Sequence, residues 1–162
     1  MYLNDHLATS LKGSMGMVKM TLADMTDGEL LTRPVAGANH GNWQIGHLIK
    51  SEAAIVAMAG GKVVELPEKF GDLYAQSKTN LDGAENFLTK DVLLATFEKV
   101  RAAAIEFAQT ATPEQFATQS PEHIRRLAPT VLDLVQLLIG HTAMHIGQIQ
   151  VLRRKLGKPI LF

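Results

Sequence analysis

The chain has 162 residues, a length that favours one domain covering residues 1–162. Its 16 basic and 16 acidic residues balance to a formal net charge of zero, which argues against nucleic acid as the main partner. The lack of cysteine excludes disulfides, cysteine-ligated metals and a thiol nucleophile supplied by the protein. No apolar run is long enough for a membrane span, and Asp5 and His6 interrupt the N-terminal stretch, so we expect a cytoplasmic protein without membrane contacts.

Four segments show the three- and four-residue spacing of apolar side chains that predicts amphipathic helices. The first segment covers about residues 3–25. Gly13 and Gly16 lie inside it, and they either allow another backbone to approach closely or are tolerated in a loose helix. Thr26 and Glu29 then form a capping-box pattern, which predicts a short helical turn.

The second helix is expected to begin with Asn42 as its N-cap and to end near Ala59, before two glycines. Residues 62–88 are expected to be irregular, apart from one helical turn near residues 70–76. A connection of this length is uncommon in a compact domain, and it is either a functional flap or a packed connection between two non-adjacent ends. If substrate contacts lie outside the helices, we expect them in this connection. The third helix is expected over residues 89–110.

Residues 112–115 (Thr-Pro-Glu-Gln) have the pattern of an N-cap, a first-position proline and a capping-box partner, which predicts another short helix. The fourth helix is expected to start at Pro129 or Thr130 and to end before Gly157. The basic residues 153–155 occupy its last turn, where their positive charges interact favourably with the negative end of the helix dipole. Without any alternating strand pattern, the sequence predicts an all-α four-helix bundle with long connections.

Two of the six histidines lie on the inward-facing seam of the fourth helix. The seam residues recur at spacings of four and three: Leu134, Leu138, His141, His145, Gln148 and Leu152. Side chains four residues apart lie on one face of a helix, so both imidazoles can reach a single ion. The alternative is that water or side-chain partners satisfy both rings in the core.

His47 lies one turn into the second helix, on a face that is small and polar at first and apolar later: Gln44, Ser51, Ala54 and Met58. It can supply a third metal ligand from a facing helix, or it is a hydrogen-bonded core residue. His6 lies near the terminus, and His40 and His123 lie in connections, where we expect surface exposure.

Three segments carry a pattern in their order and spacing: Trp43-Gln44 with His47, the run from His141 to Gln148, and the basic end from Leu152 to Gly157. This pattern resembles the DinB-like (YfiT-like) superfamily, and the four expected helices extend the likeness over nearly the whole chain. The resemblance implies a four-helix bundle that holds a divalent metal through His47, His141 and His145 and that commonly forms a homodimer. Thr142 and Met144 stand where many relatives have an acidic and an aromatic residue, which leaves the implied ligands intact and alters their surroundings.

The resemblance also implies an enzyme acting on a small-molecule substrate, since known relatives include transferases and isomerases that use low-molecular-weight thiols such as bacillithiol or mycothiol. Three imidazoles leave a coordination position open and suit zinc, nickel or iron. Because the chain has no cysteine, a thiol must come from a cosubstrate, and we expect metal-activated transfer of this thiol to an electrophile. The alternatives are hydrolysis by metal-bound hydroxide and a non-catalytic, stress-related binding bundle.

Two glutamines lie one turn from the histidines, Gln44 before His47 and Gln148 after His145. They can orient a ligand or a bound water, or they are interior polar residues that pack against their neighbours. Glu52 points away from His47 on the second helix, so we do not expect it to act as a base.

Overall fold

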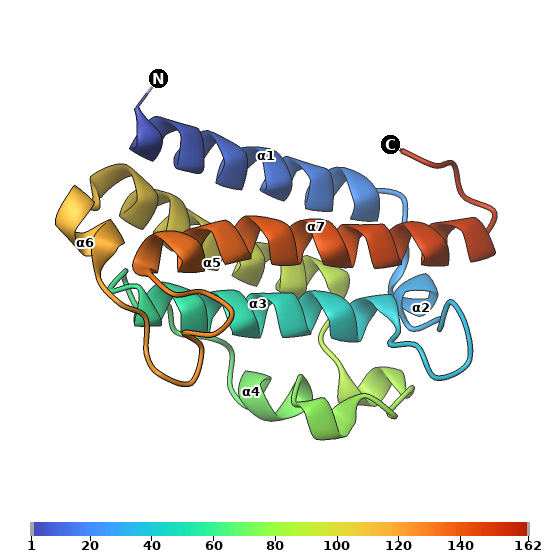
Figure 1. The fold of residues 1–162 in the computed structure, drawn as a ribbon. Helices are drawn as coiled ribbons and strands as arrows, with labels where there is room; N and C mark the ends of the chain where they lie inside the picture. Colours follow the sequence, from blue (N-terminus) through green and yellow to red (C-terminus); the bar gives the residue numbers. More distant parts are fainter. Residues whose placement is uncertain (1, 162) are drawn as a thin grey trace.

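A computed structural model describes residues 2–161, and within that range the chain forms helices and no strand. Four long helices form a bundle: α1 (Leu3–Leu22), α3 (Gly41–Met58), α5 (Lys90–Thr110) and α7 (Val131–Lys155) (Figure 1). The connections contain the short helices α2 (Asp27–Leu30), α4 (Phe70–Leu73) and α6 (Pro113–Ala117), and 3₁₀ turns at Gln76–Lys78 and Ala84–Asn86. The predicted all-α four-helix bundle is confirmed, and no described helix is both long and apolar enough to cross a membrane.

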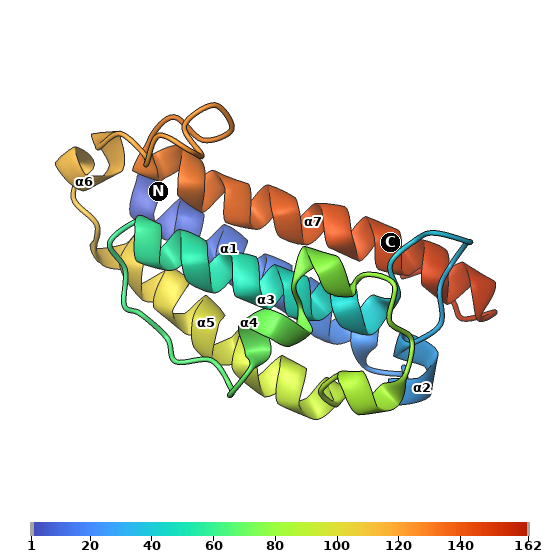
Figure 2. The same cartoon turned by 90° about the horizontal axis from the view of Figure 1, so that it is seen from below.

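The arrangement of the long helices determines where a site can form. Helices α1 and α3 each pack against both α5 and α7. Because α3 and α7 run in opposite directions, the end of α3 lies beside the beginning of α7 (Figure 1). Helix α4 covers the outer side of α3, while residues 118–130 fold back near the start of α7 (Figures 1 and 2).

The helix starts follow the predicted local patterns. Capping boxes are present at Thr26, Thr112 and Thr130, where each threonine side chain and the residue three positions on bond reciprocally to backbone N–H groups. Thr89 caps α5 by accepting a hydrogen bond from the Val92 N–H. These short-range bonds explain why the first residues of α5, α6 and α7 were predictable from the sequence.

The predicted start of α3 is wrong, because His40 and not Asn42 is its N-cap. The Nδ1 atom of His40 accepts a hydrogen bond from the Trp43 N–H at 3.1 Å. Asn42 lies inside the first turn and holds a distant segment, donating to the Leu88 carbonyl at 2.7 Å. The Asn42 side chain therefore makes a tertiary contact with Leu88 instead of capping the helix.

The core follows the apolar spacing of α1, whose periodic residues are buried except Leu3 at its first turn. Each fully buried aliphatic side chain stabilises the fold by about 1.5–3 kcal/mol. Gly13 and Gly16 face open space, since no described atom beyond the adjacent residues and the helix's own backbone lies within 4 Å of the position that a Cβ would take at either residue. No contact within the chain requires glycine there, so their use against a second chain stays a prediction.

An ion pair that the sequence analysis did not identify lies inside the bundle. Arg101 and Glu52 are each 1% exposed and form two hydrogen bonds, Nε to Oε1 and Nη2 to Oε2, both at 2.7 Å. Arg101 also donates to the Leu11 carbonyl, to Ser14 Oγ, and to Thr142 Oγ1 at 2.8 Å. This one side chain of α5 thereby bonds to all three of the other long helices.

The basic residues at the end of α7 form hydrogen bonds with other segments, in addition to lying at the negative end of the helix dipole. Arg153 is buried and donates to the Thr21 carbonyl at 2.9 Å and to the Asp24 carboxylate. Lys155 donates to the Arg33 carbonyl at 2.7 Å. These bonds join the end of α7 to the end of α1 and to the segment before α3.

Gly46 of α3 allows Tyr74 to pack directly on the helix backbone. A Cβ at residue 46 would lie 2.0 Å from Cδ1 of the Tyr74 ring. The Tyr74 hydroxyl donates to Asn42 Oδ1 and accepts from the Leu88 N–H, each at 3.1 Å, and burial raises the pKa of this phenol to about 12. The long connection after α3 is therefore anchored by this contact.

We expect Gly46→Ala to lower the free energy of unfolding by about 1–3 kcal/mol, because the added methyl group overlaps a ring that cannot move freely. Alanine normally stabilises a helix interior relative to glycine by roughly 1 kcal/mol, so the sign of the change is diagnostic. Gly140→Ala in α7 is the matched control, since nothing lies within 4 Å of its Cβ position. Urea denaturation should show opposite signs for the two variants, and equal stabilisation of both would contradict the packing argument.

Candidate metal centre

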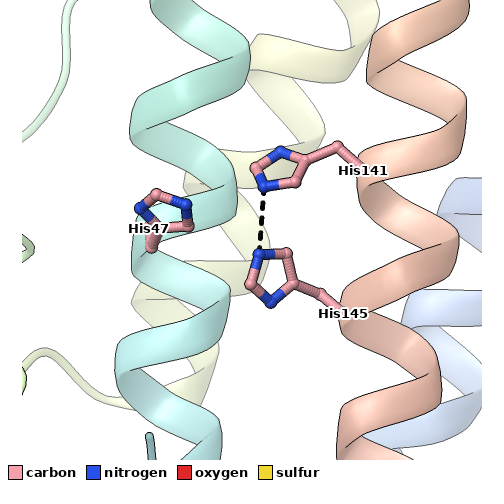
Figure 3. Close-up of side chains that lie close together, drawn as sticks. All are labelled: His47, His141 and His145. Atoms are coloured by element: carbon pink, nitrogen blue, oxygen red, sulfur yellow. Dashed lines mark hydrogen bonds between the residues drawn. The ribbon is translucent and has the colours of Figure 1, made fainter.

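Three histidine side chains converge between α3 and α7. His47 projects from α3, and His141 and His145 project from successive turns of α7 (Figure 3). One candidate ligand nitrogen from each residue lies within 4.8 Å of the other two. The ring centroid of His47 lies 5.3 Å from that of His141 and 5.4 Å from that of His145. The structure thus brings together the three histidines singled out in the sequence.

The protonation of these imidazoles suits cation binding. Burial, with smaller contributions from His141 and His47, lowers the pKa of His145 to about 4, and an interaction with Gln148 acts in the opposite direction. Burial also lowers the pKa of His47 and of His141, with further lowering by Lys50 and by His47, respectively. The neutral rings keep a nitrogen lone pair at neutral pH, which a metal ion requires.

Gln44 orients His145. Its Oε1 atom lies 3.4 Å from His145 Nδ1, and its Nε2 atom donates to the Asn39 carbonyl at 2.8 Å. Since an amide oxygen only accepts, His145 carries its proton on Nδ1 and leaves the Nε2 lone pair directed toward His141, whose Nε2 lies 3.1 Å away. An outer hydrogen bond of this kind is how proteins fix the tautomer of a ligating histidine.

The second predicted glutamine is placed differently. Gln148 is exposed, so its place on the inward seam of α7 was predicted wrongly, although it lines a cavity together with Gln44. His47 is held from the other direction by Trp43, whose ring stacks on it with centroids 4.9 Å apart. The indole Nε1–H donates to the Ala75 carbonyl at 3.3 Å, so the connection after α3 supports this stacked pair.

The remaining histidines lie outside this group. His6 and His123 are exposed, but the predicted exposure of His40 is wrong, because this side chain is completely buried. Its Nδ1 caps α3 and its Nε2 donates to the Leu81 carbonyl at 3.1 Å. Both ring nitrogens are therefore used in structure, one on each side of the junction between α3 and the later connection.

The pKa of His40 is lowered from its ordinary value of 6.5, mainly by burial and also by Arg33, while the Leu81 carbonyl and Asp82 act in the opposite direction. A folded-state pKa below the unfolded value means that the neutral ring stabilises the fold above about pH 6.5. That contribution is lost as the pH falls through the folded-state pKa, when a proton on Nδ1 would remove the acceptor for the Trp43 N–H.

We expect the metal-free protein to be more stable than its His40→Asn variant at pH 8, with an advantage that shrinks as the pH is lowered to 5. Asparagine is a good N-cap that does not titrate, so the difference between the two proteins isolates His40 from the other histidines. Urea denaturation at several pH values measures it. A difference that stays constant between pH 8 and pH 5 would show that His40 does not contribute to the pH dependence.

We call His47, His141 and His145 the triad. Two cavities lie near it, one bordered by His47 and His141 and one bordered by Gln44. The first, of about 330 Å³, borders His47 and His141 and continues between α3 and α7 toward residues 118–130. The second, of about 390 Å³, lies on the Gln44 side, beside residues 34–39. Residues 62–88 line neither of these cavities. Residues 62–65 line a separate cavity against α5, so substrate contacts from this connection stay a prediction.

Among residues 2–161, no carboxylate lines either of these cavities. The acidic residue of α3 nearest in sequence to His47, Glu52, is paired with Arg101 in the core, consistent with its exclusion as a base. Thr142 is fully buried and connects this pair to α7 one residue from His141, whereas Met144 is exposed. The two departures from the familial pattern thus occupy very different places, one in the polar core and one on the surface.

A four-helix bundle with three histidines gathered from two neighbouring helices defines the class of this protein as a helical bundle with a candidate metal centre. The sequence profile of the DinB superfamily matches residues 11–149, and the chain belongs to this superfamily. No curated protein matches the sequence significantly. The family resemblance found in the sequence is thereby confirmed.

Solved structures of other proteins share the fold. A conserved protein from Enterococcus faecalis superposes with a TM-score of 0.74 at 18% identity, covering 98% of this chain and 99% of that protein. YfiT from Bacillus subtilis superposes with a TM-score of 0.68 at 20% identity, covering 96% of this chain and 89% of that protein. YfiT is described as a probable metal-dependent hydrolase with an unusual four-helix bundle topology.

Proposed function

We propose that His47, His141 and His145 bind one divalent metal ion, and that the chain is a metal-dependent enzyme acting on a small molecule. The observation that carries this proposal is the convergence of three imidazoles with lowered pKa values, which is a donor set for zinc, nickel or iron. Gln44 orients His145, and Trp43 stacks on His47. A cation between the two rings of α7 would replace their N–H···N bond, with His141 then carrying its proton on Nδ1.

The reaction that we propose is transfer of a low-molecular-weight thiol to an electrophilic substrate. A bound divalent ion supplies Lewis acidity, which lowers the pKa of a thiol or of water beside it. A thiol has a pKa near 8.5 and needs little further help to ionise, whereas water benefits from a general base. Since no carboxylate lines the cavities beside the triad, the chain's own residues favour a thiol over water as nucleophile.

The proposed reaction is a substitution at an electrophilic carbon of the substrate. The sulfur of the cosubstrate forms a bond to the electrophilic carbon, the leaving group departs with the electron pair of the broken bond, and the thiol proton passes to solvent. The chain supplies no sulfur nucleophile itself, because it contains no cysteine. Its residues would instead position both reactants and exclude water from the apolar side of the site.

Hydrolysis with water as nucleophile is the second candidate, and the description of YfiT as a probable metal-dependent hydrolase favours it. The two reactions are separable with one protein sample. With 1-chloro-2,4-dinitrobenzene, chloride release that requires bacillithiol, mycothiol or glutathione supports transfer. Release of 4-nitrophenol from 4-nitrophenyl acetate without any thiol supports hydrolysis.

The experiment that tests the metal site comes first, and it uses protein purified without a histidine tag. Elemental analysis should find close to one zinc, nickel or iron per chain, or calorimetric titration of the metal-free protein should show one site. Failure to bind any of these metals would overturn both enzymatic proposals and leave the non-catalytic binding bundle. Light scattering of the same sample tests the proposed homodimer, for which exposed apolar residues of the adjacent helices α1 and α7 offer a surface: Met17, Met20, Met144 and Val151.

A further inference from the structure

The cavity beside the histidines extends from them toward one end of the bundle. It contacts His47 and His141 at one end, and its walls are then formed by the residues that follow His47 on α3 and by Leu137, one turn before His141 on α7. Because these helices are antiparallel, this places the cavity toward the end of the bundle where α3 ends and α7 begins (Figure 1). Ile124 and Leu127 close it from the segment between α6 and α7.

The lining of this cavity is almost wholly apolar. Apart from the two imidazoles and the Ser51 hydroxyl, it consists of aliphatic and thioether side chains: Ala54, Ile55, Met58, Ile124, Leu127 and Leu137. Leu127 lines the cavity and is 68% exposed, so the cavity is open to solvent beside this residue. A carboxylate or phosphate placed here would lose hydration without finding a cationic side chain in the lining.

The second cavity, which borders Gln44 next to His145, has a more polar lining. It offers the amide side chains of Asn39, Gln44 and Gln148. These groups can hydrogen-bond a polar reactant, whereas the first cavity offers only the Ser51 hydroxyl besides its two imidazoles. The two cavities therefore differ in their linings. The first borders His47 and His141 and is mostly apolar, whereas the second borders none of the three histidines and contains three amide side chains.

We infer that the substrate of this site carries an uncharged aliphatic or aromatic group, which occupies the compartment between α3, α7 and residues 121–128, with its reacting atom at the histidines. This inference rests on the proposed function for the reaction itself, but the apolar recognition depends only on the cavity. Its volume of about 330 Å³ is at the lower end of the roughly 300–1,000 Å³ found for small-molecule sites. A compact ring or short alkyl group fits this size better than a long acyl chain.

The test uses metal-free protein, so that no metal can bind a polar group of the ligand and mask the effect of the cavity. ¹⁹F NMR titration compares 4-fluorobenzyl alcohol with 4-fluorobenzoate, which has the same ring and a negative charge. We expect saturable binding of the alcohol and at least about tenfold weaker binding of the anion. Equal binding of both ligands, or no binding of the alcohol, would overturn the inference.

Two variants of α3 test whether the alcohol binds in the cavity. Ala54→Phe fills the compartment and should weaken binding of the alcohol at least about tenfold. Ala57→Phe is the matched control, because Ala57 is also exposed on α3 but does not line the cavity, and its affinity should match that of the parent. Equal losses in both variants would contradict the assignment.

A second measurement needs no variant and therefore does not depend on how Ala54→Phe folds. Methyl NMR signals of Met58, Leu127 and Leu137 should shift as the alcohol is added, and shifts confined to other methyl groups would overturn the inference. Calorimetric zinc titration of the same preparation reports on the metal proposal separately. Zinc binding without alcohol binding rejects only the apolar compartment, whereas alcohol binding without zinc binding rejects only the metal site.

Discussion

Replacement of His141 by alanine is expected to weaken zinc binding by more than about 100-fold, provided that the three histidines form one metal site. Loss of a hydrogen-bond partner one step outside a metal site already costs about 10–100-fold in affinity, and loss of a ligand should cost more. His141 is only half-buried and bonds to His145 rather than to the apolar core, so the variant should remain folded. Calorimetric titration of metal-free, tag-free protein with zinc measures the change.

The matched control is His123→Ala, which removes an exposed histidine that does not belong to the triad. Its zinc affinity should equal that of the parent, whereas His47→Ala and His145→Ala should resemble His141→Ala. Urea denaturation of each variant establishes that the loss does not come from unfolding. Undiminished zinc binding by His141→Ala would show that the metal, if bound, is held elsewhere.

Arg101→Met is expected to lower the free energy of unfolding by about 3–5 kcal/mol, the largest stability effect that we predict. The substitution leaves the Glu52 carboxylate buried without its partner, and it also removes the donors to Leu11, Ser14 and Thr142. An uncompensated buried charge is far more costly than the loss of a favourable contact. Urea denaturation followed by circular dichroism measures the difference.

Two further variants make this prediction specific. The double variant Arg101→Met with Glu52→Leu removes both charges and should recover much of the lost stability, because apolar replacements of a buried ion pair are often nearly neutral. Lys19→Met breaks the ion pair with Glu98, whose side chains are about half-exposed, and should change stability by no more than about 1 kcal/mol. If Arg101→Met behaved like Lys19→Met, the buried pair would have no structural importance.

The helices could be predicted from the sequence alone, because their signals are local. The apolar spacing and the threonine caps at Thr89, Thr112 and Thr130 depend on residues only three or four positions apart, and they predicted α5, α6 and α7 closely. The pairing of His141 with His145 was predictable for the same reason, since the pitch of one helix sets their separation.

Other features required contacts that no local pattern contains. His40 was expected at the surface because it lies in a connection, yet packing of that connection against Leu81 and Phe87 buries it and makes it the cap of α3. Arg101 and Glu52 are charged residues of types that are usually exposed, so the sequence analysis did not place them in the core. A signal was available, since both lie on the apolar faces of their helices, but only the bundle shows that they meet.

The candidate site divides in the same way. Local spacing singled out the three histidines, and the family likeness grouped them, but only the packing of α3 against α7 brings His47 to within reach of the other two. The apolar cavity also depends on tertiary structure, because its walls come from α3, α7 and residues 121–128. Helix formation follows from interactions a few residues long, whereas ligand convergence and cavity shape follow from surfaces that meet only after the chain has folded.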